Sequence, residues 1–206
     1  MKIDLHVHSC HSTRSSIWLL KKIGCAECYT TPQQLYDIAK RQGMEAVTIT
    51  DHNSIDGALE IADRPDVFIS CEVTAYFPED QCKLHVLVWD MTQEQFKMID
   101  ELRTNVYEMV DYLQKNNIYH GLAHPFFSLN DKLDLEKFEK CLLLFNHFEI
   151  NGDEEHRSND LLQLIINNLE KNDLDRISDK YNMAPVGELY WQKGLFGGSD
   201  DHSSLN

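Results

Sequence analysis

The sequence predicts an α/β fold, a small or incomplete βα barrel of about seven strands. Strand-like and helix-like segments alternate along the chain, which implies parallel strands joined by right-handed crossovers. Metal-binding side chains follow several strands, and both chain ends carry a pair of them, His6 with His8 and Asp200 with His202. A closed barrel places its first and last strands side by side and can therefore join these pairs. An open doubly wound sheet is the alternative, although it spreads its strand ends along a line.

Composition suits one globular domain over residues 1–206 with a full hydrophobic core. The net charge of -15 argues against long nucleic acid as a partner. We expect no membrane anchor, because no apolar run reaches the roughly 20 residues of a span and the first residues lack a signal-peptide pattern. The six scattered cysteines then predict reduced thiols in the cytoplasm. Cys25 and Cys28 lack the second pair of a zinc site, so two free thiols are favoured there.

The first half of the chain predicts strands and two helices. Strand-like segments are found at 3–6, 46–50, 67–71 and 84–89. A helix begins at Thr31, with Pro32 in its first turn, and ends at Gly43. The apolar positions on one face of that helix are Leu35, Ile38 and Ala39. A short second helix is expected at 56–63.

The second half predicts longer helices. Thr92 and Gln95 have the spacing of a capping box, which opens a long helix. Its buried stripe is Phe96, Ile99, Leu102, Val106, Val110 and Leu113. Further helices are expected near 135–141 and at about 159–180. The remaining strand-like segments are 118–123, 142–150 and 184–186, and the last leads into the run to Asp200.

Polar side chains gather at one end of these strands. The residues at or just past a strand end are His6, His52, Glu72, His124, Asn151 and Asp200, and His8, His85 and His202 lie nearby. A lone histidine is more often a core or surface residue, but so many on one face weaken that explanation. Buried carboxylates and imidazoles without a cation would be costly. Imidazole and carboxylate are ligands of zinc, manganese and iron, so a metal cluster is predicted.

Five motifs, in order along the chain, resemble those of the PHP (polymerase and histidinol phosphatase) superfamily. They are Asp4-Leu5-His6-Val7-His8-Ser9, Thr50-Asp51-His52-Asn53, Cys71-Glu72-Val73-Thr74, Ala123-His124-Pro125 and Gly198-Ser199-Asp200-Asp201-His202. The match runs from Ile3 to His202. The segments 18–24 and 30–32 resemble a bacterial branch of the superfamily that is sometimes joined to glycosyltransferase modules.

The resemblance implies a distorted seven-stranded, TIM-like βα barrel with two or three divalent metals (Zn, Mn or Fe) at the carboxyl ends of its strands. The first metal would be held by His6, His8, Glu72 and Asp200. Glu72 would bridge to a second metal, which His85 and His124 also hold, and His52 and His202 would belong to a third position. The superfamily has an Asp or His where this chain has Thr13. We therefore expect a two-metal core and an exchangeable third site, in which His11 or Ser12 could substitute.

These residues predict a metal-dependent phosphoesterase that uses a metal-activated water. Its substrate would be a phosphomonoester or phosphodiester of a small metabolite, nucleotide or short oligonucleotide. The catalytic residues would be Glu72, Asp200 and His202, the last as a proton donor if the third metal is absent. Arg14 would grip the phosphate, with a surface arginine as the equal alternative, and Asn151 would contact substrate.

Three further expectations complete the prediction. Asp4 and Asp51 would orient ligand histidines. Another metal-dependent hydrolase, for example of an amide, is an alternative function, because the ligand set alone does not choose the reaction. A non-catalytic or regulatory metal-binding module of a larger protein is the second alternative.

Overall fold

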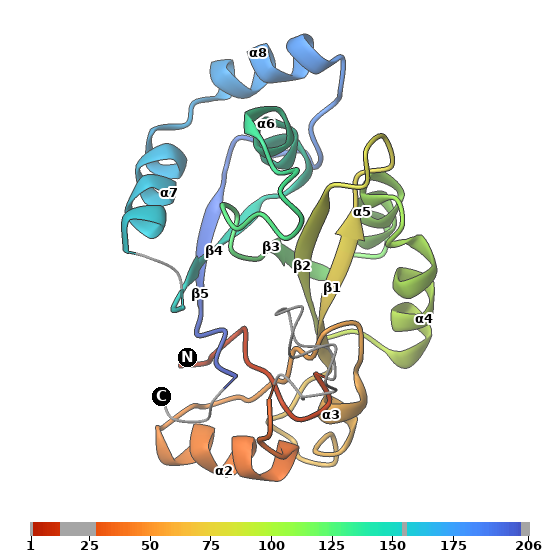
Figure 1. Cartoon of the computed structure of the whole chain (residues 1–206), viewed down its shortest axis with the longest axis vertical. Helices are drawn as coiled ribbons and strands as arrows, with labels where there is room; N and C mark the ends of the chain where they lie inside the picture. Colours follow the sequence, from red (N-terminus) through yellow and green to blue (C-terminus); the bar gives the residue numbers. More distant parts are fainter. Residues whose placement is uncertain (1, 13–27, 154–155, 203–206) are drawn as a thin grey trace.

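A computed structural model describes residues 2–12, 28–153 and 156–202. Within these ranges, five strands form one mixed sheet in the order β1-β2-β3-β4-β5 (Figure 1). The strands are β1 Ser70–Tyr76, β2 Lys83–Trp89, β3 Tyr119–Leu122, β4 His147–Asn151 and β5 Gly194–Gly198. The pairs β1–β2 and β2–β3 are antiparallel, whereas β3–β4 and β4–β5 are parallel.

The predicted seven-stranded barrel is therefore wrong, and so is the all-parallel sheet. The described residues form a single open sheet of five strands and no closed barrel. The segments 3–6 and 46–50 form no regular strand, and only isolated parallel bridges occur near them, such as Val7 with Asp201 and Val47 with Val67. In the described residues, single backbone hydrogen bonds link these segments to their neighbours without forming a regular ladder. The N–H of Thr50 donates to the carbonyl of Val7, and that of Val47 donates to the carbonyl of Asp66.

Seven helices surround the sheet in the described ranges. They are α2 Pro32–Arg41, α3 Asp56–Leu59, α4 Gln93–Leu102, α5 Val106–Lys115, α6 Leu135–Leu144, α7 His156–Asn168 and α8 Lys171–Tyr181. The capping box of Thr92 is confirmed. The long helix expected after it is two helices, because the Asn105 side chain accepts the N–H of Tyr107 and so caps a new helix, α5. The helix expected at 159–180 is likewise divided between α7 and α8.

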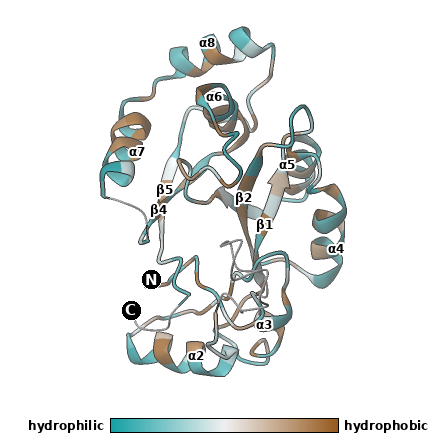
Figure 2. Cartoon of the chain, viewed as in Figure 1, coloured by the Kyte–Doolittle hydropathy of each residue, from teal (hydrophilic) through white to brown (hydrophobic). Residues whose placement is uncertain are grey.

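Three apolar clusters form in the described residues, and the two larger ones hold helices in place. The larger joins one face of β1 and β2 to α5 and α6, with Val73, Val86, Val110 and Leu143 almost fully buried. The smaller packs α2 and α3 against residues 47–49. In Figure 2, helices α2, α7 and α8 each carry both hydrophilic and hydrophobic stretches, as expected for helices with one face on the protein.

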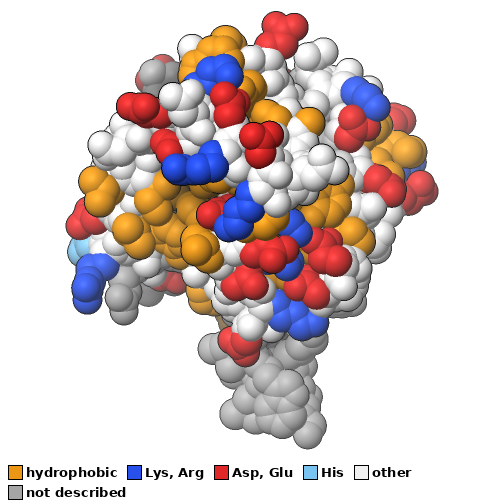
Figure 3. All heavy atoms as spheres, turned by 90° about the horizontal axis from the view of Figure 1, so that it is seen from above, with side chains coloured by type: hydrophobic (Ala, Val, Ile, Leu, Met, Phe, Trp, Pro, Cys, Tyr) orange, Lys and Arg blue, Asp and Glu red, His pale blue; other side chains and the backbone are white. Residues whose placement is uncertain are grey.

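The outer surface near α8 is charged. Figure 3, seen from above Figure 1, shows acidic and basic side chains interleaved around smaller apolar areas. Ion pairs there include Lys180 with Glu139 and Lys171 with Asp175. No helix in the described part of the chain is long and apolar enough to span a membrane. The cytoplasmic location stays a prediction.

Candidate metal centre

The antiparallel pair β1–β2 brings Glu72 and His85 to the same face of the sheet. Glu72 is opposite Leu87, and Thr74 is opposite His85, so strand alternation puts all four side chains on one side. The other face of these strands belongs to the larger apolar cluster. Glu72 is fully buried, and its Oε1 lies 2.7 Å from Nδ1 of His85.

The two ends of the chain meet beside Glu72. The backbone N–H of Asp200 donates to the carbonyl of His6 (2.8 Å), and that of His8 donates to the carbonyl of Asp201 (3.1 Å). These bonds place the Asp200 carboxylate next to both imidazoles, as the sequence predicted. Asp4 accepts the backbone N–H groups of His6 and Ser199, so it orients the backbone here rather than an imidazole.

Four side chains converge on one point. Nε2 of His6 and Nε2 of His8 are 3.1 Å apart. Oδ1 of Asp200 lies 3.3 Å from the first of these atoms and 3.2 Å from the second. The Glu72 carboxylate lies 3.3 Å from His6 Nε2 through Oε1 and 3.4 Å from His8 Nε2 through Oε2.

This spacing fits a divalent metal. Ligand atoms about 2.0–2.1 Å from a tetrahedral zinc ion are separated by roughly 3.3–3.4 Å, which is close to the separations just described. Neutral imidazoles and carboxylates turn lone pairs toward such a point, and lone pairs repel one another unless a cation or proton lies between them. The donor set of His6, His8, Glu72 and Asp200 therefore fits a divalent metal, and their role as its ligands stays a prediction.

A second group of side chains shares Glu72. Oε1 of Glu72 lies 3.1 Å from Nε2 of His124, and that nitrogen is 3.2 Å from Nδ1 of His85. His124 follows β3 with a positive φ of 25°. Glu72 thus offers oxygen to the His6–His8 group and to the His85–His124 group.

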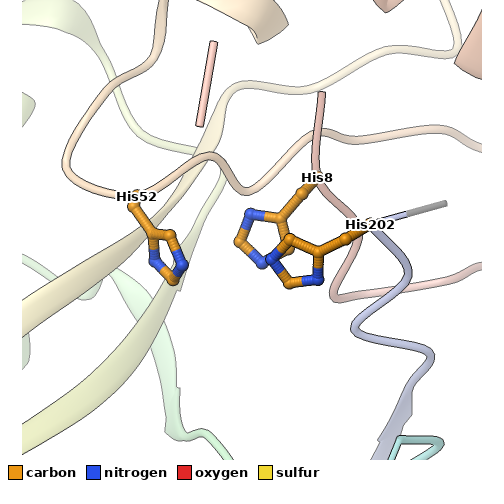
Figure 4. A group of neighbouring side chains, drawn as sticks. All are labelled: His8, His52 and His202. Carbon is orange, nitrogen blue, oxygen red and sulfur yellow. The ribbon is translucent and has the colours of Figure 1, made fainter. Parts of the chain in front are cut away.

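The third group comprises His8, His52 and His202 (Figure 4). The rings of His8 and His202 are stacked with centroids 4.1 Å apart, and the His52 ring centroid is 4.6 Å from that of His8. Nδ1 of His52 lies 2.6 Å from Oε2 of Glu72. Nε2 of His202 is buried and has no hydrogen-bond partner in the described structure.

Electrostatics prepare the cluster for a cation. Burial opposes the charge of Glu72, but His85, His52 and His6 outweigh it and hold the pKa of Glu72 well below its usual value. Burial lowers the pKa of His8 to about 3 and that of His85 to about 4. Because only a neutral imidazole binds a metal, these two histidines are ready to bind without losing a proton. Burial opposes the charge of His6 and His124 as well, but Glu72 outweighs it and raises the pKa of both, so these two would release a proton on binding a metal.

Of the two residues predicted to contact substrate, Arg14 and Asn151, only Asn151 lies in the described part of the chain. Arg14, like Thr13, lies outside the described residues. Asn151 is 1% exposed, and its Nδ2 donates to Glu149 Oε2 (3.0 Å) and to Asp200 Oδ2 (3.2 Å). Its substrate contact stays a prediction. In the structure, its side-chain amide donates hydrogen bonds to two carboxylates and so helps to hold them in place.

Sequence reasoning missed Glu149 and the contact that Ser12 makes. Oε1 of Glu149 lies 2.8 Å from Nδ1 of His6, and Oγ of Ser12 lies 2.8 Å from Nδ1 of His8. The sequence could have pointed to Glu149, because it is a charged residue between apolar neighbours in a predicted strand. Ser12 had no such signal. Asp51, expected to orient a histidine, acts on His8 only through Ser12 Oγ, 3.0 Å from its Oδ1.

Comparisons with known proteins leave the family open. No protein-family model matches the chain. An uncharacterized protein of Methanocaldococcus jannaschii is 42% identical over 60 residues, which cover 29% of this chain and 33% of that protein. The likeness thus extends over about a third of that relative's length.

Solved structures show a shared fold. An amidohydrolase from Chromobacterium violaceum has a TM-score of 0.61 at 13% identity, covering 98% of this chain and 88% of its own. A candidate metal-dependent phosphoesterase from Bifidobacterium adolescentis has 0.53 at 13%, covering 99% and 88%. The lesion-specific endonuclease PfuEndoQ from Pyrococcus furiosus has 0.51 at 17%, covering 98% and 48%. At these identities the likeness shows the fold alone, and membership of a bacterial branch stays a prediction.

Proposed function

We propose that this chain is a metal-dependent hydrolase that cleaves phosphate monoesters or diesters of small molecules. One observation carries the proposal: Glu72 is a fully buried carboxylate whose two oxygens lie within 3.4 Å of nitrogens from five histidines. Two ligand groups that share one carboxylate are typical of two-metal hydrolases. The hydrolases that share its fold, among them a candidate phosphoesterase and an endonuclease, also support it.

The residues of the chain divide the work as follows. His6, His8 and Asp200 would hold the first metal and His85 and His124 the second, with Glu72 between them. Divalent cations bound there would activate a water and neutralise charge on the phosphoryl oxygens. The protein supplies the burial that keeps bulk water out, because His6, His8 and Glu72 are at most 1% exposed.

His202 is the proposed proton donor. Its Nδ1 lies 2.8 Å from the carbonyl of Asp200, to which it donates, so the ring is held in place. Nε2 is left to carry a proton toward the leaving oxygen of the ester. With a third metal present, the same nitrogen would instead join His52 as a ligand, which is the alternative role.

Phe127 gives the rim of the site an exposed apolar surface. Its side chain is 52% exposed, and its ring centroid lies 5.5 Å from that of His124. Its backbone N–H donates to the His124 carbonyl (2.9 Å), which fixes the turn between them. We assign this ring to contact with a base or aryl group of the substrate, since aromatic faces stack on such groups.

Phosphate release tests the proposal. The protein would be loaded with manganese, zinc or iron and assayed on aryl phosphates, nucleotides, short oligonucleotides and amides. Release of phosphate or of the ester alcohol is expected from the wild type, and none from a His6→Ala/Asp200→Ala variant that still folds. Bound metal without turnover on the whole panel would favour the regulatory module, and turnover of amides alone would favour an amidohydrolase.

A further inference from the structure

We infer that Glu149 and the Asp51–Ser12 pair are positioning residues that set the tautomers of His6 and His8. In the assigned tautomer Nδ1 carries the ring hydrogen, and Nε2 is left to bind the metal. The inference rests on the proposed function, because it concerns the residues that would hold the first metal.

For His6 the partner is the Glu149 carboxylate, which already accepts two other hydrogen bonds. Oε1 of Glu149 lies 2.8 Å from Nδ1 of His6, and both side chains are fully buried. Oε2 of Glu149 accepts the backbone N–H of His124 (2.8 Å) and Nδ2 of Asn151 (3.0 Å). Since a carboxylate can only accept, the hydrogen shared with His6 belongs to Nδ1. Nε2 then faces His8, Glu72 and Asp200.

For His8 the partner is the hydroxyl of Ser12, whose single hydrogen is already donated to Asp51. Oγ of Ser12 lies 3.0 Å from Oδ1 of Asp51, which can only accept, so the hydroxyl hydrogen points to Asp51. The same oxygen accepts the backbone N–H of His52 (3.2 Å). Nδ1 of His8, 2.8 Å away, must therefore donate to it. Nε2 of His8 is left toward the centre, like Nε2 of His6.

Two glycines make room for the two carboxylates. A Cβ atom at Gly57 would lie 2.2 Å from Oδ2 of Asp51, and one at Gly198 would lie 2.1 Å from Oε1 of Glu149. Neither distance is possible for real atoms, so a side chain at either glycine would displace a carboxylate. The backbone thus packs closely against Asp51 and Glu149 at these glycines, which is expected of carboxylates that hold histidine rings in a fixed position.

Ser12→Ala and Glu149→Gln test the inference, with Ser70→Ala as the matched control. Ser70 is a fully buried serine whose Oγ accepts from Thr48 and has no hydrogen bond to a histidine among the described residues. Zinc affinity would be measured by competition with a chelator. We expect a loss of about 10- to 100-fold for Ser12→Ala and Glu149→Gln, and less than twofold for Ser70→Ala. An unchanged affinity for Ser12→Ala, or an equal loss for Ser70→Ala, would overturn the inference.

A spectroscopic measurement on the wild type tests the same inference, even if one of the variants fails to fold. Long-range proton–nitrogen spectra of the zinc-loaded wild type identify which ring nitrogen carries hydrogen. Nδ1–H is expected for His6 and His8, and Nε2–H at either would overturn the assignment. Zinc binding with these tautomers but no ester hydrolysis would contradict the proposed function alone.

Discussion

Nδ1 of His85 lies 2.7 Å from Oε1 of Glu72, and the two residues come from adjacent antiparallel strands. β1 and β2 are joined only by residues 77–82, so the shared carboxylate and one imidazole are fixed on a single hairpin. The hairpin, rather than a parallel crossover, sets the distance between the shared carboxylate and His85.

Glu72→Gln should remove the shared ligand without changing the shape of the side chain. An amide is a poorer metal ligand than a carboxylate, and it cannot offset the charge of two cations. We expect the metal content after dialysis, measured by elemental analysis, to fall from about two per chain to one or none. Glu79→Gln, in the turn of the same hairpin, should keep the wild-type content. Full metal content in the Glu72 variant would contradict the bridging role.

His202→Gln should slow hydrolysis in proportion to the need for a proton donor. Alkyl phosphates have a poor leaving group, so we expect kcat to fall by about 10²- to 10⁴-fold on them. 4-Nitrophenyl phosphate leaves without protonation and should be much less affected. Equal losses on both substrates, accompanied by loss of metal, would show that His202 binds metal instead.

Phe127→Ala should weaken binding of substrates that contain a base or an aryl ring. Loss of one stacking contact costs about 1 kcal/mol or more, roughly a fivefold rise in KM. The kcat value and the KM for a small alkyl phosphate should not change. Tyr119→Ala is the control, because Tyr119 is 70% exposed at the opposite end of β3. A KM that rises equally for all substrates would rule out stacking.

Lys193 should make stability depend on pH outside the metal centre. Its Nζ donates to the carbonyl of Phe145 (2.7 Å) and to Oδ1 of Asn146 (2.9 Å), and burial lowers its pKa from 10.5 to about 7. Between these pH values the unfolded chain binds more protons than the folded protein. This group therefore adds to the free energy of unfolding as the pH rises from about 7 to 10.

Lys193→Met should abolish that contribution. In urea titrations of metal-free protein, the wild type should gain stability relative to the variant as the pH rises, by at most about 1.4 kcal/mol per pH unit. Parallel curves for the two proteins from pH 7 to 9.5 would show that Lys193 keeps an ordinary pKa.

The sequence predicted the members of the site better than the sheet that carries them. Metal-binding side chains at the ends of apolar segments mark one face whatever the strand order, so His52, Glu72, His85 and His124 are brought together although the barrel is wrong. The hairpin could have been predicted, because the apolar segments 67–71 and 84–89 are separated by a stretch with Pro78 and no helical pattern.

Other features had no local signal. The segment 46–50 has a strand pattern, but it forms only isolated bridges and single backbone hydrogen bonds, and Thr50 has its partner Val7 43 residues away. The contact of Glu149 with His6 joins residues 143 apart, and neither neighbourhood points to the other. Such pairings are decided by the packed structure rather than by propensity.

The meeting of the two chain ends has a consequence for how the protein comes apart. Ser199 and Asp4 are hydrogen-bonded across 195 positions, and His6 and Asp200 lie beside them in the proposed first metal site. An ion held by both would act as a removable cross-link that closes almost the whole chain into a loop, and long loops gain most from closure. Neither end could then fray without releasing the ion, so a chelator should speed unfolding rather than only lower its midpoint.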